Sequence, residues 1–293
     1  MQTLESLRSS IDSTNQMLSV VKTMKALAAI SIREYERAVD ALSVYNETIE
    51  MGLQVVLKDR APVPLTEPLE GQRLGAIVFG SDQGLAGQFN ERIAAFALER
   101  FSHFDDDWRH RRIMAVGQRV TGPLVDGGLH VTEESRMPGA LEGVRLTGQN
   151  ILLKIDEWRA ERGVERIVLF HNTPTSSASY EPRMRWMLPI NPRWLRSLQN
   201  RSWESRSLPI HTMSYTDLFS GLVRQLLFVM LYRAIAESLA SENASRLRSM
   251  QSAEKNIGER LDELKAQYQH RRQTAITEEI LDIAAGFEAL SGS

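Results

Sequence analysis

The 293-residue sequence predicts an α/β protein in which long N- and C-terminal helices form an antiparallel, left-handed coiled coil and flank a central α/β domain. Three observations predict this class: a seven-residue apolar repeat near the N-terminus, alternating strand and helix patterns in the middle, and a proline-free helical stretch near the C-terminus. They divide the chain into an N-terminal coiled-coil helix (1–58), a linker and central α/β domain (59–211), and a C-terminal coiled-coil helix (212–293).

The N-terminal segment contains no proline, and its only glycine is Gly52. Its apolar residues recur at alternating spacings of four and three, which keeps one stripe, the seam, against a partner helix and predicts a left-handed supercoil. The apolar members of the seam are Leu4, Leu7, Ile11, Leu18, Val21, Ala28, Ile32, Tyr35, Val39, Leu42, Ile49, Leu53 and Val56. Thr14, Lys25 and Asn46 are polar seam positions, and a lysine there must snorkel to solvent or meet a carboxylate.

Three prolines in residues 59–72 indicate a linker, after which the period of the pattern changes. Short apolar or alternating runs predict strands, and amphipathic runs between them predict helices. The expected strands are 74–80, 111–117, 129–137, 165–173 and 179–190, and the expected helices are 88–101 and 144–163. This alternation predicts a mostly parallel sheet of Rossmann-like type. The polar residues 192–211 are expected to be irregular.

The C-terminal segment is helical from about Thr216 to Leu290 and also lacks proline. Neither terminal helix can bury its apolar stripe alone, so we expect them to pair, with the longer C-terminal helix projecting beyond its mate. The most apolar stretch, 219–240, is interrupted by Arg224, Gln225 and Arg233, which favours a helix docked on protein over a membrane span.

Composition excludes several functions. The formal net charge is −2, so no global basic field indicates a nucleic-acid partner. The absence of cysteine excludes disulfides, thiolate chemistry and Cys-ligated zinc. His103, His110 and the acidic run 105–107 could face a metal, but charged runs between elements are usually solvated, and we expect no metal site.

The stretch "FGSDQGLAGQFN" (79–90) follows a predicted strand and resembles a phosphate-binding turn. Its glycines fit neither the Walker A nor the dinucleotide spacing, no Lys-Ser/Thr pair follows, and its aspartate would repel an anion. We therefore expect a structural turn without a cofactor. The residues of this turn are Gly80, Asp82, Gly84 and Gly87.

The stretch "RRQTAITEEI" (271–280) gathers charged and hydrogen-bonding side chains within three helical turns. A solvated helix surface with weak i,i+4 pairs would have this composition. On a projecting helix with no partner in the chain, a contact surface is the better interpretation.

Four segments resemble the γ subunit of rotary F-type ATP synthases, in the right order along the whole chain. They are "VVKTMKALAA" (20–29), "SDQGLAGQFN" (81–90), "ASENASRLRSM" (240–250) and "YQHRRQTAITEEILDI" (268–283). Within the second segment, Gln83, Ala86 and Gln88 replace the family's usual Arg, Cys and Gly. These departures indicate a divergent branch, such as the alternate Na⁺- or H⁺-linked type.

The resemblance implies a non-catalytic rotary shaft whose partners are the α and β subunits of the catalytic hexamer, the ε subunit and the membrane c-ring, with no nucleic acid and no insertion into the membrane. It also implies a peripheral position on the cytoplasmic face of a bacterial inner membrane. The implied contacts with β subunits are Met24, Lys25, Arg271, Arg272, Gln273, Thr277 and Glu279. A stand-alone α/β enzyme and a structural scaffold with coiled-coil arms are the alternatives.

Overall fold

The computed structural model describes residues 3–58, 60, 73–104, 110–176, 179–203, 207 and 209–291. It has two compact units. The domain unit comprises Ala28–Arg246, and the terminal unit comprises Met1–Leu27 together with Leu247–Ser293. The predicted linker 59–72 lies outside the described residues, apart from Arg60.

Eleven elements are described along these residues. The helices are α1 (Leu4–Lys58), α2 (Phe89–Phe101), α3 (Gln118–Asp126), α4 (Leu141–Arg162), α5 (Pro192–Asn200) and α6 (Tyr215–Ser291). The strands are β1 (Arg73–Phe79), β2 (Arg112–Val116), β3 (Glu133–Ser135), β4 (Val164–Ser176) and β5 (Ser179–Leu188). Both predicted long helices and all five predicted strands are present.

The strands form one sheet in the order β3-β2-β1-β4-β5. β1, β2, β3 and β4 pair in parallel, while β5 pairs antiparallel with β4 at the edge of the sheet. Only residues 177–178 separate β4 from β5, which is too short for the crossover that a parallel pair requires. The mostly parallel α/β sheet predicted from the sequence is confirmed.

The two faces of β1 follow from its period-two alternation. Ile77 and Phe79 face α4 and the first part of α6, in a core that includes Trp158 and Ile235. The alternate positions Leu74, Ala76 and Val78 face α2 and α3. The domain unit therefore has three layers, and α6 belongs to one of them.

Two short helices depart from the expectations. α5 lies inside the predicted irregular segment 192–211; it begins at Pro192, and the Asn191 side chain accepts hydrogen bonds from the Arg193 and Trp194 amides. A capping Asn followed by Pro at the first helical position is a strong start signal that the polar composition obscured. α3 was not predicted because Gly122 and Pro123 interrupt it.

The seam of α1 faces inward, as predicted. Every apolar seam residue is buried or half-buried, from Leu7 at 3% exposure to Leu53 at 0%. In the domain unit, the Tyr45 hydroxyl bonds to Gln225 of α6, and Gly52, farther along α1, lies against Leu222, earlier in α6. The two helices therefore run antiparallel there.

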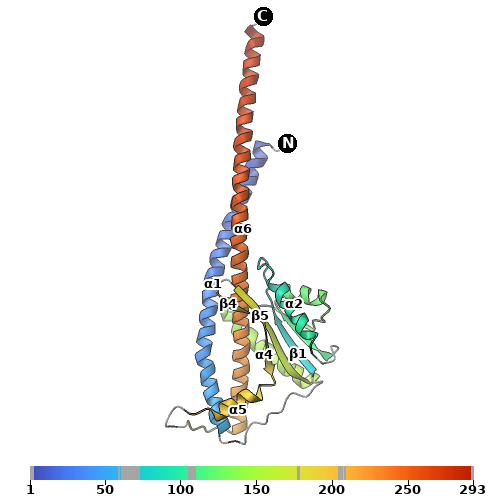
Figure 1. Ribbon diagram of the computed structural model, residues 1–293, viewed down its shortest axis with the longest axis vertical. Coiled ribbons are helices and arrows are strands. Elements are labelled where there is room, and N and C mark those ends of the chain that lie inside the picture. Colours follow the sequence, from blue (N-terminus) through green and yellow to red (C-terminus); the bar gives the residue numbers. More distant parts are fainter. Residues whose placement is uncertain are drawn as a thin grey trace. The chain divides into compact units, whose positions relative to one another are not determined.

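In the terminal unit, the register follows from an ion pair between Lys25 of α1 and Glu254 of α6. Leu4, where α1 begins, lies 21 residues before Lys25, so its antiparallel counterpart lies 21 residues after Glu254, at Ala275. The remainder of α6 extends past the start of α1 (Figure 1). The projecting C-terminal end is thus confirmed.

A matched pair of glycines tests how tightly the domain unit is packed. Gly117 has a φ of 110°, and a Cβ there would lie 2.7 Å from the Ser81 amide nitrogen, whereas a Cβ at Gly122 would meet nothing within 4 Å. We expect Gly117→Ala to lower the free energy of unfolding by about 3 kcal/mol through backbone strain and steric clash. Gly122→Ala should raise it by roughly 0.5 kcal/mol because it lies inside a helix. Urea unfolding of the two variants measures the difference, and equal effects would contradict this packing.

Candidate functional site

The predicted contact residues of α6 lie beside the start of α1 and beyond it. Arg271 is half-buried, while Arg272, Gln273, Thr277 and Glu279 are exposed. The Thr277 hydroxyl donates to the Gln273 carbonyl of its own helix, at 2.9 Å. Among the described residues, no ion pair involves Arg271, Arg272 or Glu279. Their charges are therefore available to another molecule.

Large apolar side chains share this end of α6. Ile276, Ile280 and Ile283 are 46%, 60% and 67% exposed, in contrast to Leu261 and Leu264, which are buried farther back in the same helix. At about 100° per residue, these isoleucines fall on the same half of the helix as the predicted polar contacts from Arg272 to Glu279. The face from Arg272 to Ile283, here called the α6 end face, combines apolar area with directional polar groups. This composition is typical of a protein-binding surface.

The predicted contact residues on α1 are less exposed than those on α6. Met24 and Lys25 are both half-buried, and the Lys25 ammonium pairs with Glu254 of the same chain. The sequence required either a carboxylate or solvent for this lysine, and the structure supplies the carboxylate from α6. A contact of Met24 or Lys25 with another subunit stays a prediction.

The glycine turn is held by hydrogen bonds of side chains from the stretch 79–90. The Asn90 side chain accepts from the Ser81 amide at 2.9 Å and donates to the Ser81 hydroxyl at 2.9 Å. Asp82 accepts from the backbone amide of Gln118, the first residue of α3, at 2.9 Å. The carboxylate thus caps α3, on the neighbouring connection, and not α2, which directly follows the turn.

The four predicted turn residues serve this structure in different ways. A Cβ at Gly80 would clash with Val120 and Asn90 at 2.4 and 2.7 Å, and Gly87 has a φ of 56°. Gly84 has more space, its nearest neighbour being the Arg119 side chain at 3.7 Å. These backbone and packing requirements account for Gly80 and Gly87 without a ligand.

Helix α6 takes the place that a nucleotide occupies in a dinucleotide-binding domain. Strand order reverses between β1 and β4, and in open α/β sheets ligands bind at the carboxyl ends of the strands at such a point. Here the Ser245 hydroxyl of α6 donates to the Ala86 carbonyl of the turn at 2.6 Å and lies 3.2 Å from the Tyr180 hydroxyl of β5. The Ala86 carbonyl of the turn therefore accepts its hydrogen bond from α6 of the same chain.

A buried carboxylate, Glu237, joins α6 to β4 close by. It contacts His171 Nε2 at 2.9 Å and Arg233 Nε at 2.7 Å, and it accepts a longer bond from Thr173 at 3.3 Å. Burial by itself raises the pKa of Glu237, but the hydrogen bonds and charges of His171 and Arg233 outweigh it and lower that pKa to about 2. Sequence reasoning did not single out Glu237 or Ser245. Both residues could have been found as polar side chains on the core-facing side of an otherwise apolar helix.

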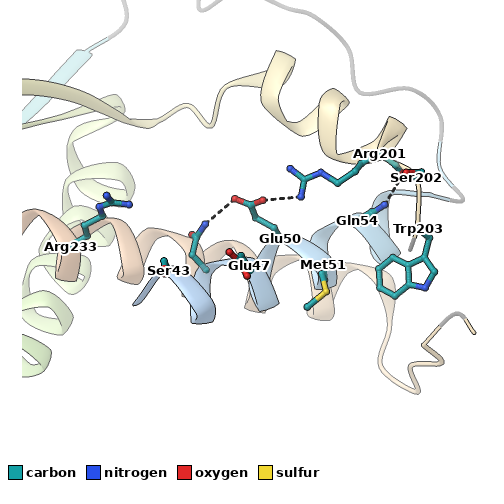
Figure 2. A pocket seen from close by; sticks show the side chains of 10 residues that line it. Ser43, Glu47, Glu50, Met51, Gln54, Arg201, Ser202, Trp203 and Arg233 are labelled. Carbon is teal, nitrogen blue, oxygen red and sulfur yellow. Dashed lines mark hydrogen bonds and ion pairs between the residues drawn. The ribbon is translucent and has the colours of Figure 1, made fainter. Parts of the chain in front are cut away.

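A cavity of about 780 Å³, lined mainly by polar residues, lies between α1, Arg233 of α6 and residues 201–203, which follow α5. Figure 2 shows the Arg201 guanidinium facing the Glu50 carboxylate, and this pair is 3.2 Å apart. The same carboxylate accepts from Asn46, and Gln54 donates to the Arg201 carbonyl at 2.7 Å. A smaller apolar cavity of about 400 Å³ shares Met51 and Trp203 with it. These groups suit a polypeptide contact and present no arrangement for acid–base or nucleophilic catalysis.

Neither a metal centre nor a membrane span is required by the described residues. They contain no group of three or more His, Cys, Asp or Glu side chains that could hold a metal ion. Of the run 103–110, residues 105–109 lie outside the described part. One helix, Tyr215–Ala285 of α6, is long and apolar enough to cross a membrane by length and composition alone. About 33% of its most apolar window is buried, and Leu231, Ile235 and Leu239 of α6 belong to the domain core.

Comparison with known proteins gives a consistent result. A family model described as ATP synthase matches residues 3–290. Proteins named ATP synthase gamma chain from Christiangramia forsetii and Geotalea uraniireducens are each 28% identical, over 299 and 302 residues, with all of both chains covered. The gamma chain of Nostoc punctiforme is 26% identical over 320 residues, covering 99% of this chain and 100% of the relative.

Solved structures share the fold at lower identity. A chain of the Euglena gracilis mitochondrial ATP synthase, solved with OSCP, F1 and c-ring, has a TM-score of 0.64 and 16% identity, and the match covers 98% of this chain and 94% of that one. A chain of the Tetrahymena thermophila central stalk and c-ring has a TM-score of 0.56 and 16% identity, with 80% and 99% covered. The arrangement of an α/β domain with long terminal helices is thus a known one.

The contacts of Glu237 give a pH-dependent stability. A carboxyl group whose pKa falls on folding stabilises the protein above its unfolded pKa, near 4.5, and this contribution is lost as the pH falls toward 2. Relative to Glu237→Gln, we expect the wild-type chain to be more stable at pH 7 by on the order of 3 kcal/mol, with the difference shrinking as the pH falls below 4.5. Urea unfolding at several pH values measures it. Glu181→Gln, which breaks an exposed pair with Arg183, should change stability by less than about 1 kcal/mol throughout.

Proposed function

The chain belongs to the ATP synthase family, and we propose that it is the γ subunit of a rotary F-type enzyme, the central shaft that couples ion flow through a membrane ring to ATP synthesis and hydrolysis at the β subunits. The catalytic residues lie on other chains, so this chain couples sites without performing the chemistry. The observation that carries the proposal is the α6 end face, which presents isoleucines and unpaired charges beyond the start of α1.

Such a face is unfavourable on a protein that works alone. Contiguous exposed apolar side chains promote association, and a helix with no neighbouring helix has little tertiary support. Inside the bore of a hexamer the isoleucines form a low-friction bearing surface, and the polar groups between them contact the surrounding subunits. Charge-assisted hydrogen bonds of this kind are individually worth about 1.5–3 kcal/mol, which permits them to form and break in each turn.

Coupling follows from asymmetry. One shaft inside a ring of three catalytic β subunits presents a different surface to each of them. A different contact gives each site a different nucleotide affinity, and rotation of the shaft exchanges these affinities among the sites. We assign the β-subunit contacts to Met24, Lys25, Arg271, Arg272, Gln273, Thr277 and Glu279, with the turn residues Gly80, Asp82, Gly84 and Gly87 serving structure.

The partners follow from the same assignment. The paired terminal helices engage the α and β subunits, and the α/β domain engages the ε subunit and the c-ring. The chain is then a peripheral protein on the cytoplasmic face of a bacterial inner membrane, taking part in ion transport through the complex. The alternative of a stand-alone α/β enzyme is disfavoured because Ser245 of α6 already binds the glycine turn.

Co-purification tests the assignment. The chain, expressed with α, β and ε subunits and a carboxy-terminal tag on β, should elute as one complex that hydrolyses ATP. A complex of α and β subunits that forms without the chain, while the chain elutes alone as a stable monomer, would contradict the shaft assignment.

A double variant tests the α6 end face. Arg272→Ala with Gln273→Ala removes two exposed polar groups without touching any contact inside the chain. Because an unpaired partner carboxylate at a partly buried interface costs about 1–3 kcal/mol, we expect ATP-driven ion pumping to fall roughly fivefold or more while assembly is retained. Acidification or ion uptake of inverted membrane vesicles measures pumping.

The matched control lies two turns back on the same helix, outside the α6 end face. Lys265→Ala with Gln267→Ala also removes one exposed cation and one exposed amide. Pumping by this variant should stay within about twofold of the wild type, as is usual for surface substitutions. Normal pumping by the Arg272/Gln273 variant in an intact complex would reduce those residues to a solvated helix surface.

A further inference from the structure

Two segments that carry the family resemblance meet each other within the domain unit. The segment at 240–250 contributes Ser245, and the glycine turn at 81–90 contributes the Ala86 carbonyl, which accepts the Ser245 hydroxyl at 2.6 Å. Ser245 is 6% exposed and Ala86 3% exposed, so this bond is shielded from water. The Tyr180 hydroxyl of β5 lies 3.2 Å from the same serine. One side chain of α6 therefore contacts both the turn after β1 and the edge strand.

A second polar attachment lies two helical turns earlier on α6. Glu237 is 7% exposed and contacts two residues of β4, His171 and Thr173, at 2.9 and 3.3 Å. Glu237 and Ser245 are eight residues apart, which places them on the same side of the helix. Together they bind α6 to the carboxyl ends of β1 and β4 and to β5.

The rest of the α6 contact with the domain is apolar. Leu231, Ile235 and Leu239 pack in the core beside α4 and the sheet. Apolar contacts are non-directional and oppose separation of the surfaces. Hydrogen bonds require narrow ranges of distance and angle, so they oppose rotation and sliding of the helix as well. Apolar side chains of α6 thus hold the helix against the domain, while its hydrogen-bonding side chains prevent it from rotating or sliding.

We propose that Glu237 and Ser245 form the mechanical junction through which torque passes between the α/β domain and helix α6. This inference rests on the proposed function as a rotary shaft. In that setting the domain is turned by the membrane ring, and α6 must turn with it against the resistance of the hexamer. Glu237 and Ser245 are positioning residues: they touch no nucleotide and fix the helix on the domain.

The structure offers a matched pair of serines for the test. Ser241 is fully buried one turn before Ser245, but its hydroxyl donates to the Glu237 carbonyl of α6 itself, at 2.8 Å, and makes no bond to the domain. Ser245→Ala therefore removes the junction bonds, whereas Ser241→Ala removes a bond of similar burial within the helix. Glu237→Gln, combined with Ser245→Ala, weakens both attachments while keeping the side-chain shape at position 237.

Each variant is measured in two preparations. In the soluble complex with α and β subunits, no ring loads the α/β domain, so ATP hydrolysis by every variant should stay within about twofold of the wild type. In the full complex in sealed vesicles, ions pumped per ATP should fall about threefold for Ser245→Ala as the gradient builds, and further for the double variant. Ser241→Ala should pump like the wild type. This load-dependent loss would not arise from general destabilisation, which would lower both readouts.

The outcomes separate the two hypotheses. If wild-type chain fails to assemble with the hexamer or to couple hydrolysis to pumping, the shaft assignment itself is wrong. If the wild type couples and the double variant keeps the wild-type ratio of ions to ATP at the highest gradient, the junction is wrong. If the double variant fails to assemble, Ser245→Ala alone decides, because loss of one hydroxyl leaves the packing intact. An equal fall in ions pumped per ATP for Ser241→Ala and Ser245→Ala would also overturn the proposal.

Discussion

Helix α6 must satisfy two opposite solvent conditions along one continuous backbone, and the rest of the structure is arranged around that requirement. In the domain unit it is a core element, with Leu231 and Ile235 fully buried against the sheet layer. In the terminal unit it begins against α1 and ends with exposed isoleucines. A helix of 77 residues is not stabilised by propensity alone, so each part depends on its own tertiary partner. Past the start of α1, α6 has no helix of its own chain beside it, so its packing partner has to come from another molecule.

The same helix fills the space beside the glycine turn, through the bond from Ser245 to the Ala86 carbonyl. A strand order that reverses between β1 and β4 creates a crevice that many α/β domains use for a ligand. Here protein occupies it, through the Ser245 hydroxyl and the buried Glu237 carboxylate. The turn keeps the tight backbone geometry of a binding loop, with Leu85 and Gly87 both at positive φ, but it binds a helix. Fold likeness therefore identifies a place for binding without identifying what binds.

The long periodic elements were predictable from the sequence because their pattern directly reflects which residues are buried. The seam of α1 was correct residue by residue, and the short apolar run that predicted β1 is buried from Leu74 to Phe79. Features that depend on partners distant in sequence were not predictable. Asp82 caps α3 across 36 residues, and the helix itself contains Gly122 and Pro123, which argue against a helix locally. α5 was not predicted because its segment is polar, although Asn191 and Pro192 form a helix start signal at its beginning.

The exposed polar residues from Arg272 to Glu279 were predictable as a cluster, because the projecting helix had no expected partner in the chain; their contact with another subunit stays a prediction. The carboxylate that meets Lys25 could not be chosen from the sequence, because the register of α1 against α6 depends on how the long stretch of chain between them folds. That single ion pair has a consequence for sliding. A displacement of α1 along α6 by one heptad would set the Lys25 ammonium opposite Leu261 or Leu247 in place of Glu254. An apolar seam alone would tolerate such a step, whereas the step would break this ion pair, so the pair favours the observed alignment of the two helices.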